Sequence, residues 1–152
     1  RDRQRPDARL VIVGRDTPEG YQRIAALRDV GNRVVFVGWT PEIFEWYAAA
    51  DAVVLLSWYD PCSRVVLEAA RWGIPSMTTR FNGAAEAFGD AGCIVVDSPK
   101  DVRAVVDGLD ELADPDRRER HAEACREIAD QLSMERHVER LVEVYAEAPR
   151  LE

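Results

Sequence analysis

Residues 52–75, AVVLLSWYDPCSRVVLEAARWGIP, contain the complete repeating unit of an α/β fold. The five apolar residues Ala52–Leu56 predict a strand that is buried on both faces, and a polar loop follows them. Ser63 predicts the N-cap of a helix, and Gly73 predicts its end. A weaker strand is expected over residues 74–79. A strand, a helix and a strand in this order predict parallel pairing through a crossover helix.

The same alternation continues on both sides of this stretch. The other predicted strands are residues 10–14, 34–38 and 93–96, and the other predicted helices are residues 17–29, 40–47, 99–112, 115–132 and 134–147, with caps at Thr17, Thr40, Asp114 and Ser133. A short helix is also expected near Glu86. We therefore predict an α/β fold with a doubly wound, mainly parallel, Rossmann-like sheet of about five strands and flanking helices.

The bulk composition excludes several classes of protein. The chain has 152 residues and a net charge of −8, so we expect one domain over residues 1–152 and no nucleic-acid partner, because phosphates favour a basic surface. Clustered basic residues for an anionic membrane are lacking, and no apolar run approaches the roughly 20 residues of a membrane span. Cys62, Cys93 and Cys125 include no metal-binding pair and suggest reduced thiols, so a cytoplasmic location is expected.

Open parallel sheets bind ligands beyond the carboxyl ends of their strands. Here these ends lead into Gly14-Arg15-Asp16, Gly38-Trp39-Thr40 and the loop of residues 57–63. Gly14 begins no G-x-G-x-x-G sequence, so a dinucleotide fingerprint is not supported. We expect the third loop to carry the chemistry, because it combines a carboxylate with the start of a helix.

The third loop and the helix that follows it combine backbone amides with two carboxylates, which suits a phosphorylated sugar. The backbone amides of Ser63, Arg64 and Val65, which we expect to be free at the first turn of the helix, can hold a phosphate with help from the helix dipole. Glu68 lies one and a half turns further on, and its side chain leans back toward the helix start. Asp60 and Glu68 are therefore expected to flank one ligand, since a carboxylate can accept hydrogen bonds from two neighbouring hydroxyls.

Asp60 and Glu68 stand in D-P-C-S-R-V-V-L-E-A-A-R-W-G-I-P, which resembles the E-P-F-G-x-x-x-L-E-A-x-A-x-G-x-P signature of retaining GT-B glycosyltransferases of the group 1 family. The similarity extends over nearly the whole chain, through Val34-x-Phe36-x-Gly38, Ala50-Asp51-Ala52 and Asn82-Gly83-Ala84-Ala85-Glu86. Among the positions that depart from the signature, Asp60 is one methylene shorter than the usual Glu, and Cys62 and Ser63 replace Phe and Gly.

The resemblance implies a role for each matched residue. Glu68 would bind the ribose hydroxyls, Asp60 would contact the transferred sugar, and the amides between them would hold the diphosphate. The backbone of Gly38-Trp39 would meet the base, and Arg64 adds a charge beside the phosphates. We include Gly14, at the end of the first strand, among the donor-binding residues.

The resemblance also implies that the chain is half of a GT-B architecture. An upstream strand, with a basic loop that neutralises the diphosphate, and the acceptor-binding domain are expected to be absent. The remaining strand order would be 2-1-3-4-5, counted along the chain. We expect the loop at Trp58 and Tyr59 to be the exposed apolar part of the surface facing the acceptor domain, and this fragment alone to be inactive.

Each candidate residue also has a structural interpretation. Asp60 can begin a turn with Pro61, Glu68 can be an ordinary helix-surface residue, and Gly14 and Gly38 can simply end strands. Ser63 can act as a cap alone, and Arg64 can be solvated. We interpret Trp39, Trp58 and Tyr59 as packing residues rather than stacking partners. His121 and His137, on acidic outer helices, are expected to be solvated, which leaves no catalytic histidine.

The leading hypothesis is therefore the donor domain of a hexosyltransferase. The full enzyme would move a hexose from a nucleoside diphosphate sugar to an acceptor with retention, without a metal and without a cofactor. Stabilisation of the leaving diphosphate by the helix amides would be the main catalytic effect visible in this chain. The alternatives are a nucleotide-sugar epimerase of the same architecture and a non-catalytic module that binds sugar nucleotides or proteins.

Overall fold

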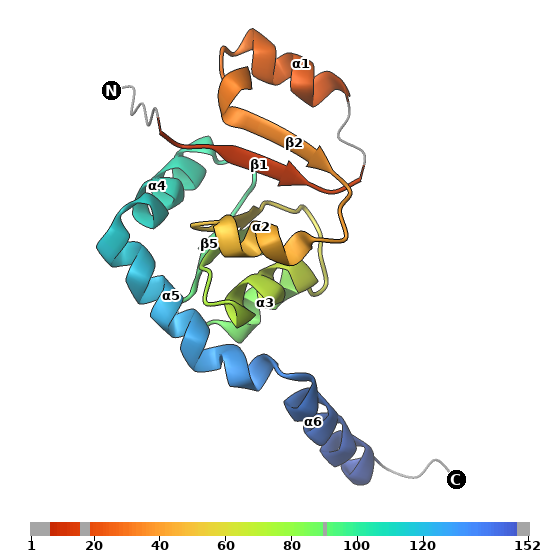
Figure 1. The fold of residues 1–152 in the computed structure, drawn as a ribbon. Helices are drawn as coiled ribbons and strands as arrows, with labels where there is room; N and C mark the ends of the chain where they lie inside the picture. Colours follow the sequence, from red (N-terminus) through yellow and green to blue (C-terminus); the bar gives the residue numbers. More distant parts are fainter. Residues whose placement is uncertain (1–6, 16–18, 90, 149–152) are drawn as a thin grey trace. The chain divides into compact units, whose positions relative to one another are not determined.

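A computed structural model of the chain describes residues 7–15, 19–89 and 91–148, and the chain is divided into two compact units, residues 1–46 and 47–152. Figure 1 shows that strands and helices alternate along the chain. The strands are β1 (Leu10–Val13), β2 (Val34–Gly38), β3 (Val53–Leu55), β4 (Ser76–Thr79) and β5 (Cys93–Val96). The helices are α1 (Glu19–Leu27), α2 (Ile43–Ala49), α3 (Arg64–Arg71), α4 (Val102–Ala113), α5 (Pro115–Ala129) and α6 (Met134–Glu147), with short 3-10 turns η1 (Gly31–Arg33), η2 (Gly83–Ala87) and η3 (Asp130–Leu132).

The described strands form two parallel sheets, which confirms the α/β class. β1 pairs with β2, from Leu10 opposite Val34 to Val13 opposite Gly38, and β3, β4 and β5 form a second sheet in that order. The expected single sheet of five strands is wrong in this respect, because β1 and β3 share no ladder in the described part of the chain. In the sheet that the resemblance implies, a further strand separates these two, and the described residues supply none.

The burial of the strands differs from the sequence-based expectation. Leu10, Val11 and Val35 in the first sheet are 51%, 40% and 42% exposed, so these strands are not buried on both faces. β4, which was expected to be the weaker strand, is buried at every position. The hydroxyls of its two threonines donate to the neighbouring backbone, Thr78 Oγ1 to the carbonyl of Leu55 at 2.7 Å and Thr79 Oγ1 to that of Ser57 at 2.6 Å, whereas Oγ of the buried Ser76 has no partner among the described residues. A central strand therefore tolerates hydroxyl groups.

Most of the expected helix ends are confirmed. Ser63 caps α3 by accepting from the amide of Val66, and Gly73 follows the helix with a φ of 69°, a conformation that favours glycine. Asp114 and Ser133 cap α5 and α6 in the same way. The predicted cap at Thr17 lies outside the described residues.

Helices cover both faces of the β3-β4-β5 sheet. Successive side chains of a strand point to opposite faces, and Cys93 of β5 belongs to one buried cluster whereas Ile94 packs against another. The first cluster contains Val66 and Ala70 of α3, Ala84 of η2, Phe88 directly after η2, Cys93 of β5 and Cys125 of α5. The second contains Met77, Val96 and Leu112, so α4 covers the opposite face. The doubly wound arrangement predicted from the sequence is therefore present in this unit.

The two histidines on the outer helices differ in their exposure to solvent. His137 is exposed, as expected, but the prediction that His121 is solvated is wrong, because only 14% of its side chain is exposed. Nδ1 of His121 accepts from the amide of Gly92 at 3.2 Å, and Nε2 lies 2.9 Å from a carboxylate oxygen of Glu111. His121 thus joins α5 to α4 and to the start of β5, which is a structural role.

Candidate functional site

The start of α3 is held in place by one buried side chain, Asn82. Its Oδ1 accepts from the amides of Ser63 and Ala84, at 3.2 and 3.1 Å, and its Nδ2 donates to Oγ1 of Thr78 at 2.9 Å. Asn82 is only 1% exposed. It therefore connects β4, η2 and the first turn of α3. In the sequence Asn82 stood out only as part of the family resemblance, and a polar residue directly after a strand was the available signal for this larger role.

Because Gly83 has no side chain, the loop before α3 can pass close to the backbone of Gly83. A Cβ atom at Gly83 would lie 2.1 Å from the carbonyl oxygen of Pro61, and the amide of Gly83 donates to the carbonyl of Asp60 at 3.0 Å. Asp60 in turn forms an isolated parallel bridge with Asn82. The turn thus sets the path of the chain into α3.

The amides at the start of α3 are not all available. The amide of Ser63 already donates to Asn82, which corrects the expectation that three amides are free, because the buried Asn82 side chain uses this one. The amide of Val66 donates to Oγ of Ser63. The amides of Arg64 and Val65 have no hydrogen bond to any residue that the structure describes. These two groups are the ones left to hold an anion.

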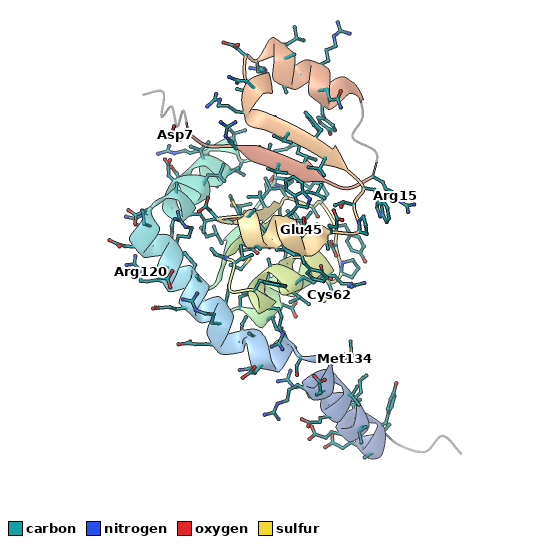
Figure 2. All side chains as sticks on the ribbon, viewed as in Figure 1. Asp7, Arg15, Glu45, Cys62, Arg120 and Met134 are labelled. Atoms are coloured by element: carbon teal, nitrogen blue, oxygen red, sulfur yellow. The ribbon has the colours of Figure 1, made fainter. Side chains whose placement is uncertain are left out.

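Asp60 lies beside these amides and is partly used by the local backbone. One of its carboxylate oxygens, Oδ1, accepts from the amide of Cys62 at 3.2 Å, which is the turn interaction expected of Asp before Pro. The residue is half-buried. Figure 2 labels Cys62, which is exposed at the start of α3. The second carboxylate oxygen of Asp60 is the one available to a ligand.

Glu68 is on the surface of α3 and has two protein partners. Oε1 accepts from the guanidinium of Arg64 at 2.9 Å, and Oε2 accepts from the hydroxyl of Tyr47 at 3.1 Å. Its side chain is 30% exposed, whereas that of Arg64 is 88% exposed. Glu68 therefore neither points into the core nor moves freely. An incoming ligand that uses Glu68 would compete with Arg64 rather than with bulk water alone.

Tyr47 is a site residue that sequence reasoning missed. It is 4% exposed, and burial, followed by its hydrogen bond to Glu68, raises the pKa of its phenol. The hydroxyl therefore stays protonated and donates to Glu68 at neutral pH. A tyrosine on the inner face of a helix needs a hydrogen-bond partner when buried, which was the available signal.

Gly14, Gly38 and Trp39 lie in the unit of residues 1–46, at the ends of β1 and β2. The amide of Gly14 donates to the carbonyl of Gly38 at 2.9 Å. Trp39 is 63% exposed, and the guanidinium of Arg15 lies 5.7 Å from the centre of its ring. The interpretation of Trp39 as a packing residue is therefore wrong, because more than half of its surface is in solvent.

The other aromatic residues near the site are also exposed. Trp58 is 54% exposed and Tyr59 81%, which confirms the expected exposed apolar loop. Trp58 does contact one ring, since its centroid lies 5.9 Å from that of Phe81. The interpretation of Tyr59 as a packing residue is wrong for the same reason as that of Trp39.

The remaining reactive groups are structural. Burial raises the pKa of the Cys93 thiol to about 12 and that of Cys125 to about 11, so both stay protonated. Over residues 7–15, 19–89 and 91–148, no three His, Cys, Asp or Glu side chains are grouped to hold a metal ion. None of the helices in those residues has the length and apolar character needed to cross a bilayer.

Comparison with known proteins gives one consistent result. Residues 1–115 match the family described as glycosyl transferases group 1. A D-inositol 3-phosphate glycosyltransferase from Thermomonospora curvata is 33% identical over 141 residues, which are 89% of this chain and 32% of that protein. The chain thus spans about a third of the length of the curated relatives that it matches over most of its own length.

Solved structures show the same fold. The crystal structure of WaaG, a glycosyltransferase involved in lipopolysaccharide biosynthesis, is 26% identical with a TM-score of 0.78, and the match covers 92% of this chain and 38% of that one. HepE from Anabaena, solved in complex with UDP-glucose, has a TM-score of 0.81 at 20% identity over 95% of this chain and 42% of that one. At that identity the likeness shows the fold alone.

Proposed function

Because the chain belongs to the glycosyl transferases group 1 family, we propose that it is the donor-substrate half of a hexosyltransferase. The complete enzyme moves a hexose from a nucleoside diphosphate sugar to an acceptor with retention of configuration. In this proposal the present chain binds the donor, and a second domain supplies the main part of the acceptor site. The chain alone is expected to give no sugar transfer, because it supplies one wall of the reaction site.

The observation that carries the proposal is the arrangement at the start of α3. The unengaged amides of Arg64 and Val65 offer two hydrogen bonds and the positive end of the helix dipole to a diphosphate. Glu68 follows on the same helix with its carboxylate near the surface. Amides fixed before the reaction stabilise the charge that develops on the leaving diphosphate at little reorganisation cost.

Arg64 and Glu68 give this site a specific binding step. The Arg64 side of their ion pair is 88% exposed, so loss of the pair costs little. A ribose hydroxyl can take the place of Arg64 at Glu68, and the released guanidinium can then pair with a phosphate oxygen. Tyr47 would keep Glu68 oriented during this exchange, because its hydroxyl donates to the other carboxylate oxygen.

A titration tests the donor assignment. UDP, GDP and ADP are added to the 15N-labelled chain, and the amide signals of Arg64 and Val65 are followed by NMR. With part of the diphosphate charge uncompensated, we expect a dissociation constant of about 1 mM for the preferred nucleotide. Unchanged signals for all three nucleotides would overturn the proposal.

The role of Glu68 is tested by Glu68→Ala. Loss of a hydrogen bond to a charged group is expected to weaken nucleotide binding about tenfold to a hundredfold. Glu123→Ala, an exposed glutamate on α5, removes the same charge and should leave binding unchanged. Equal affinities of the wild type and the Glu68 variant would show that Glu68 is only a helix-surface residue.

Asp60 is assigned to the transferred sugar rather than to the nucleotide. Asp60→Asn should therefore slow transfer when the acceptor-binding domain is present, and hardly change binding of the free nucleoside diphosphate. An equal loss of both would identify Asp60 as a turn residue, the role suggested by its hydrogen bond from Cys62.

A further inference from the structure

We propose that Trp58, Arg80, Phe81 and Lys100 form a binding surface for the acceptor, and that this acceptor is a saccharide carrying a phosphate or carboxylate group. This aromatic–cation patch lies beside the donor residues discussed above, on the unit of residues 47–152. The inference rests on the proposed function, because it assigns a second substrate to the same reaction.

Three loops bring the patch together. Trp58 follows β3, Arg80 and Phe81 follow β4, and Lys100 follows β5, so all four residues lie beyond the carboxyl ends of parallel strands. The guanidinium of Arg80 lies 5.1 Å from the centre of the Phe81 ring, and Nζ of Lys100 lies 5.3 Å from that of Trp58. The two rings contact each other. The result is a pair of rings with a cation over each.

The charges of the patch are unusual for this chain. The net charge is −8, and Lys100 is the only lysine in the sequence. Several other cations of this unit form ion pairs with nearby carboxylates, for example Arg64 with Glu68 and Arg118 with Asp51. Neither Arg80 nor Lys100 has an ion pair with any residue in the part of the chain that the structure describes. Two cations without a counter-charge favour an anionic ligand.

The loops that carry these side chains are tied to one another by hydrogen bonds. Oγ1 of Thr79 donates to the carbonyl of Ser57 at 2.6 Å, and the amide of Arg80 donates to the carbonyl of Val96 at 3.0 Å. The patch is therefore largely formed before any ligand arrives, which lowers the entropic cost of binding.

The rings explain why the ligand should be a saccharide rather than a bare anion. Trp58 is 54% exposed, and its ring offers an apolar surface to the C–H face of a pyranose. A phosphate or carboxylate on that sugar can then pair with the cations that lie over the rings. The rings thus favour the sugar part of the ligand, and the cations favour its phosphate or carboxylate.

The position of the patch indicates the acceptor. The amide of Asp60 donates to the carbonyl of Phe81 at 3.1 Å, and Trp58 precedes Asp60 by two residues. Asp60 is the residue that we assign to the transferred sugar. An acceptor must present its hydroxyl group next to that sugar, so a binding surface adjoining Asp60 is suitably placed to hold it.

The test uses the 152-residue chain with glucose 6-phosphate and glucuronate as anionic probes, and glucose as the neutral one. Each is titrated with and without saturating UDP, and the indole signal of Trp58 and the amides of residues 80–82 are followed by NMR. We expect both anionic probes to shift these signals, in the presence of UDP as well, and glucose to bind at least about tenfold more weakly.

A double variant, Arg80→Gln with Lys100→Gln, should weaken glucose 6-phosphate binding about tenfold or more while leaving UDP binding unchanged. The matched control, Arg120→Gln with Arg140→Gln, removes the same charge from exposed positions on α5 and α6, and should bind the probe like the wild type. Circular dichroism before each titration verifies that the variants are folded.

Several results would overturn the proposal. They are unshifted signals with both anionic probes, equal binding of glucose, and an unaffected double variant. If UDP-glucuronate engages Arg80 and Lys100 while UDP-glucose and free glucose 6-phosphate do not, the patch serves the donor and the acceptor assignment is wrong. Normal UDP binding in any of these cases would leave the donor proposal intact. Absent UDP binding, with the anionic probes still shifting the patch signals, would overturn the donor proposal and with it the acceptor assignment, and would leave a site for anionic saccharides.

Discussion

Replacing Asn82 by alanine tests the connection between the sheet and the proposed donor site. The side chain is buried and makes three hydrogen bonds, to Ser63, Ala84 and Thr78. Asn82→Ala removes all three hydrogen bonds, and the methyl group of alanine cannot replace them. We expect the chain to unfold at a lower urea concentration and to bind UDP more weakly.

The size of the effect follows from the partners that are left behind. The amides of Ser63 and Ala84 lose their acceptor, and an unsatisfied buried group costs about 1–3 kcal/mol. Thr78 is affected less, because its hydroxyl still donates to Leu55. The free energy of unfolding should therefore fall by about 2–6 kcal/mol, which is a large part of the roughly 5–15 kcal/mol typical of a domain.

Asn82→Asp refines the test. It keeps the two acceptor contacts but turns a negative charge toward Oγ1 of Thr78, which has no hydrogen left to donate because it already donates to Leu55. This variant should also be destabilised, and increasingly so as the pH rises through the range where the carboxyl ionises. Asn32→Ala, at an exposed position, is the control.

The assay is urea unfolding followed by circular dichroism, with linear extrapolation and comparison of the slopes. A fall of less than about 1 kcal/mol in Asn82→Ala at an unchanged slope would refute the reasoning, because it would mean that the buried amides are satisfied without Asn82.

Three further predictions concern stability and activity. Gly83→Ala should lower the free energy of unfolding, because its Cβ would lie 2.1 Å from the carbonyl of Pro61, whereas Gly20→Ala on α1 meets no atom within 4 Å and should raise it by about 0.5–1 kcal/mol. Urea unfolding of both variants decides this, and equal midpoints would contradict it. Asp114→Ala should lower the free energy of unfolding at pH 7 through loss of the cap of α5. The hydrogen bond from the amide of Arg117 lowers the pKa of Asp114. The cap is therefore fully present above the ordinary pKa of an aspartate and is lost as the pH falls through the lower folded pKa, and a difference between variant and wild type that did not shrink as the pH is lowered would count against this prediction. The 152-residue chain should transfer no glucose from UDP-glucose to any acceptor, as measured by mass spectrometry of the products. Transfer by the chain alone would show that it is more than a donor half.

The sequence was sufficient for the features that depend on local pattern. The apolar runs at β1, β2, β3 and β5 and the caps at Ser63, Asp114 and Ser133 were predictable, because burial period and capping are read within a few residues. The spacing of Asp60 and Glu68 around the start of α3 was predictable for the same reason.

Other features depended on partners that are distant in the chain. No local pattern pairs Tyr47 with Glu68, or assigns the amide of Ser63 to Asn82. A buried polar group takes whichever donor or acceptor the fold brings to it, so hydrogen bonding between separate segments is decided only when the strands and helices pack.

The division of the strands into two sheets and the meeting of Trp58, Arg80, Phe81 and Lys100 belong to this second kind. Each of these residues follows a predicted strand in the sequence. This position predicts that the residue lies at the carboxyl end of the sheet, but it does not predict which other side chains the residue contacts there. The order of strands in a sheet depends on which strands pair with each other, and the contacts between the loops that follow the strands depend on that order. The sequence by itself thus determined the elements and the motif, and the tertiary structure decided which groups remain free to bind a ligand.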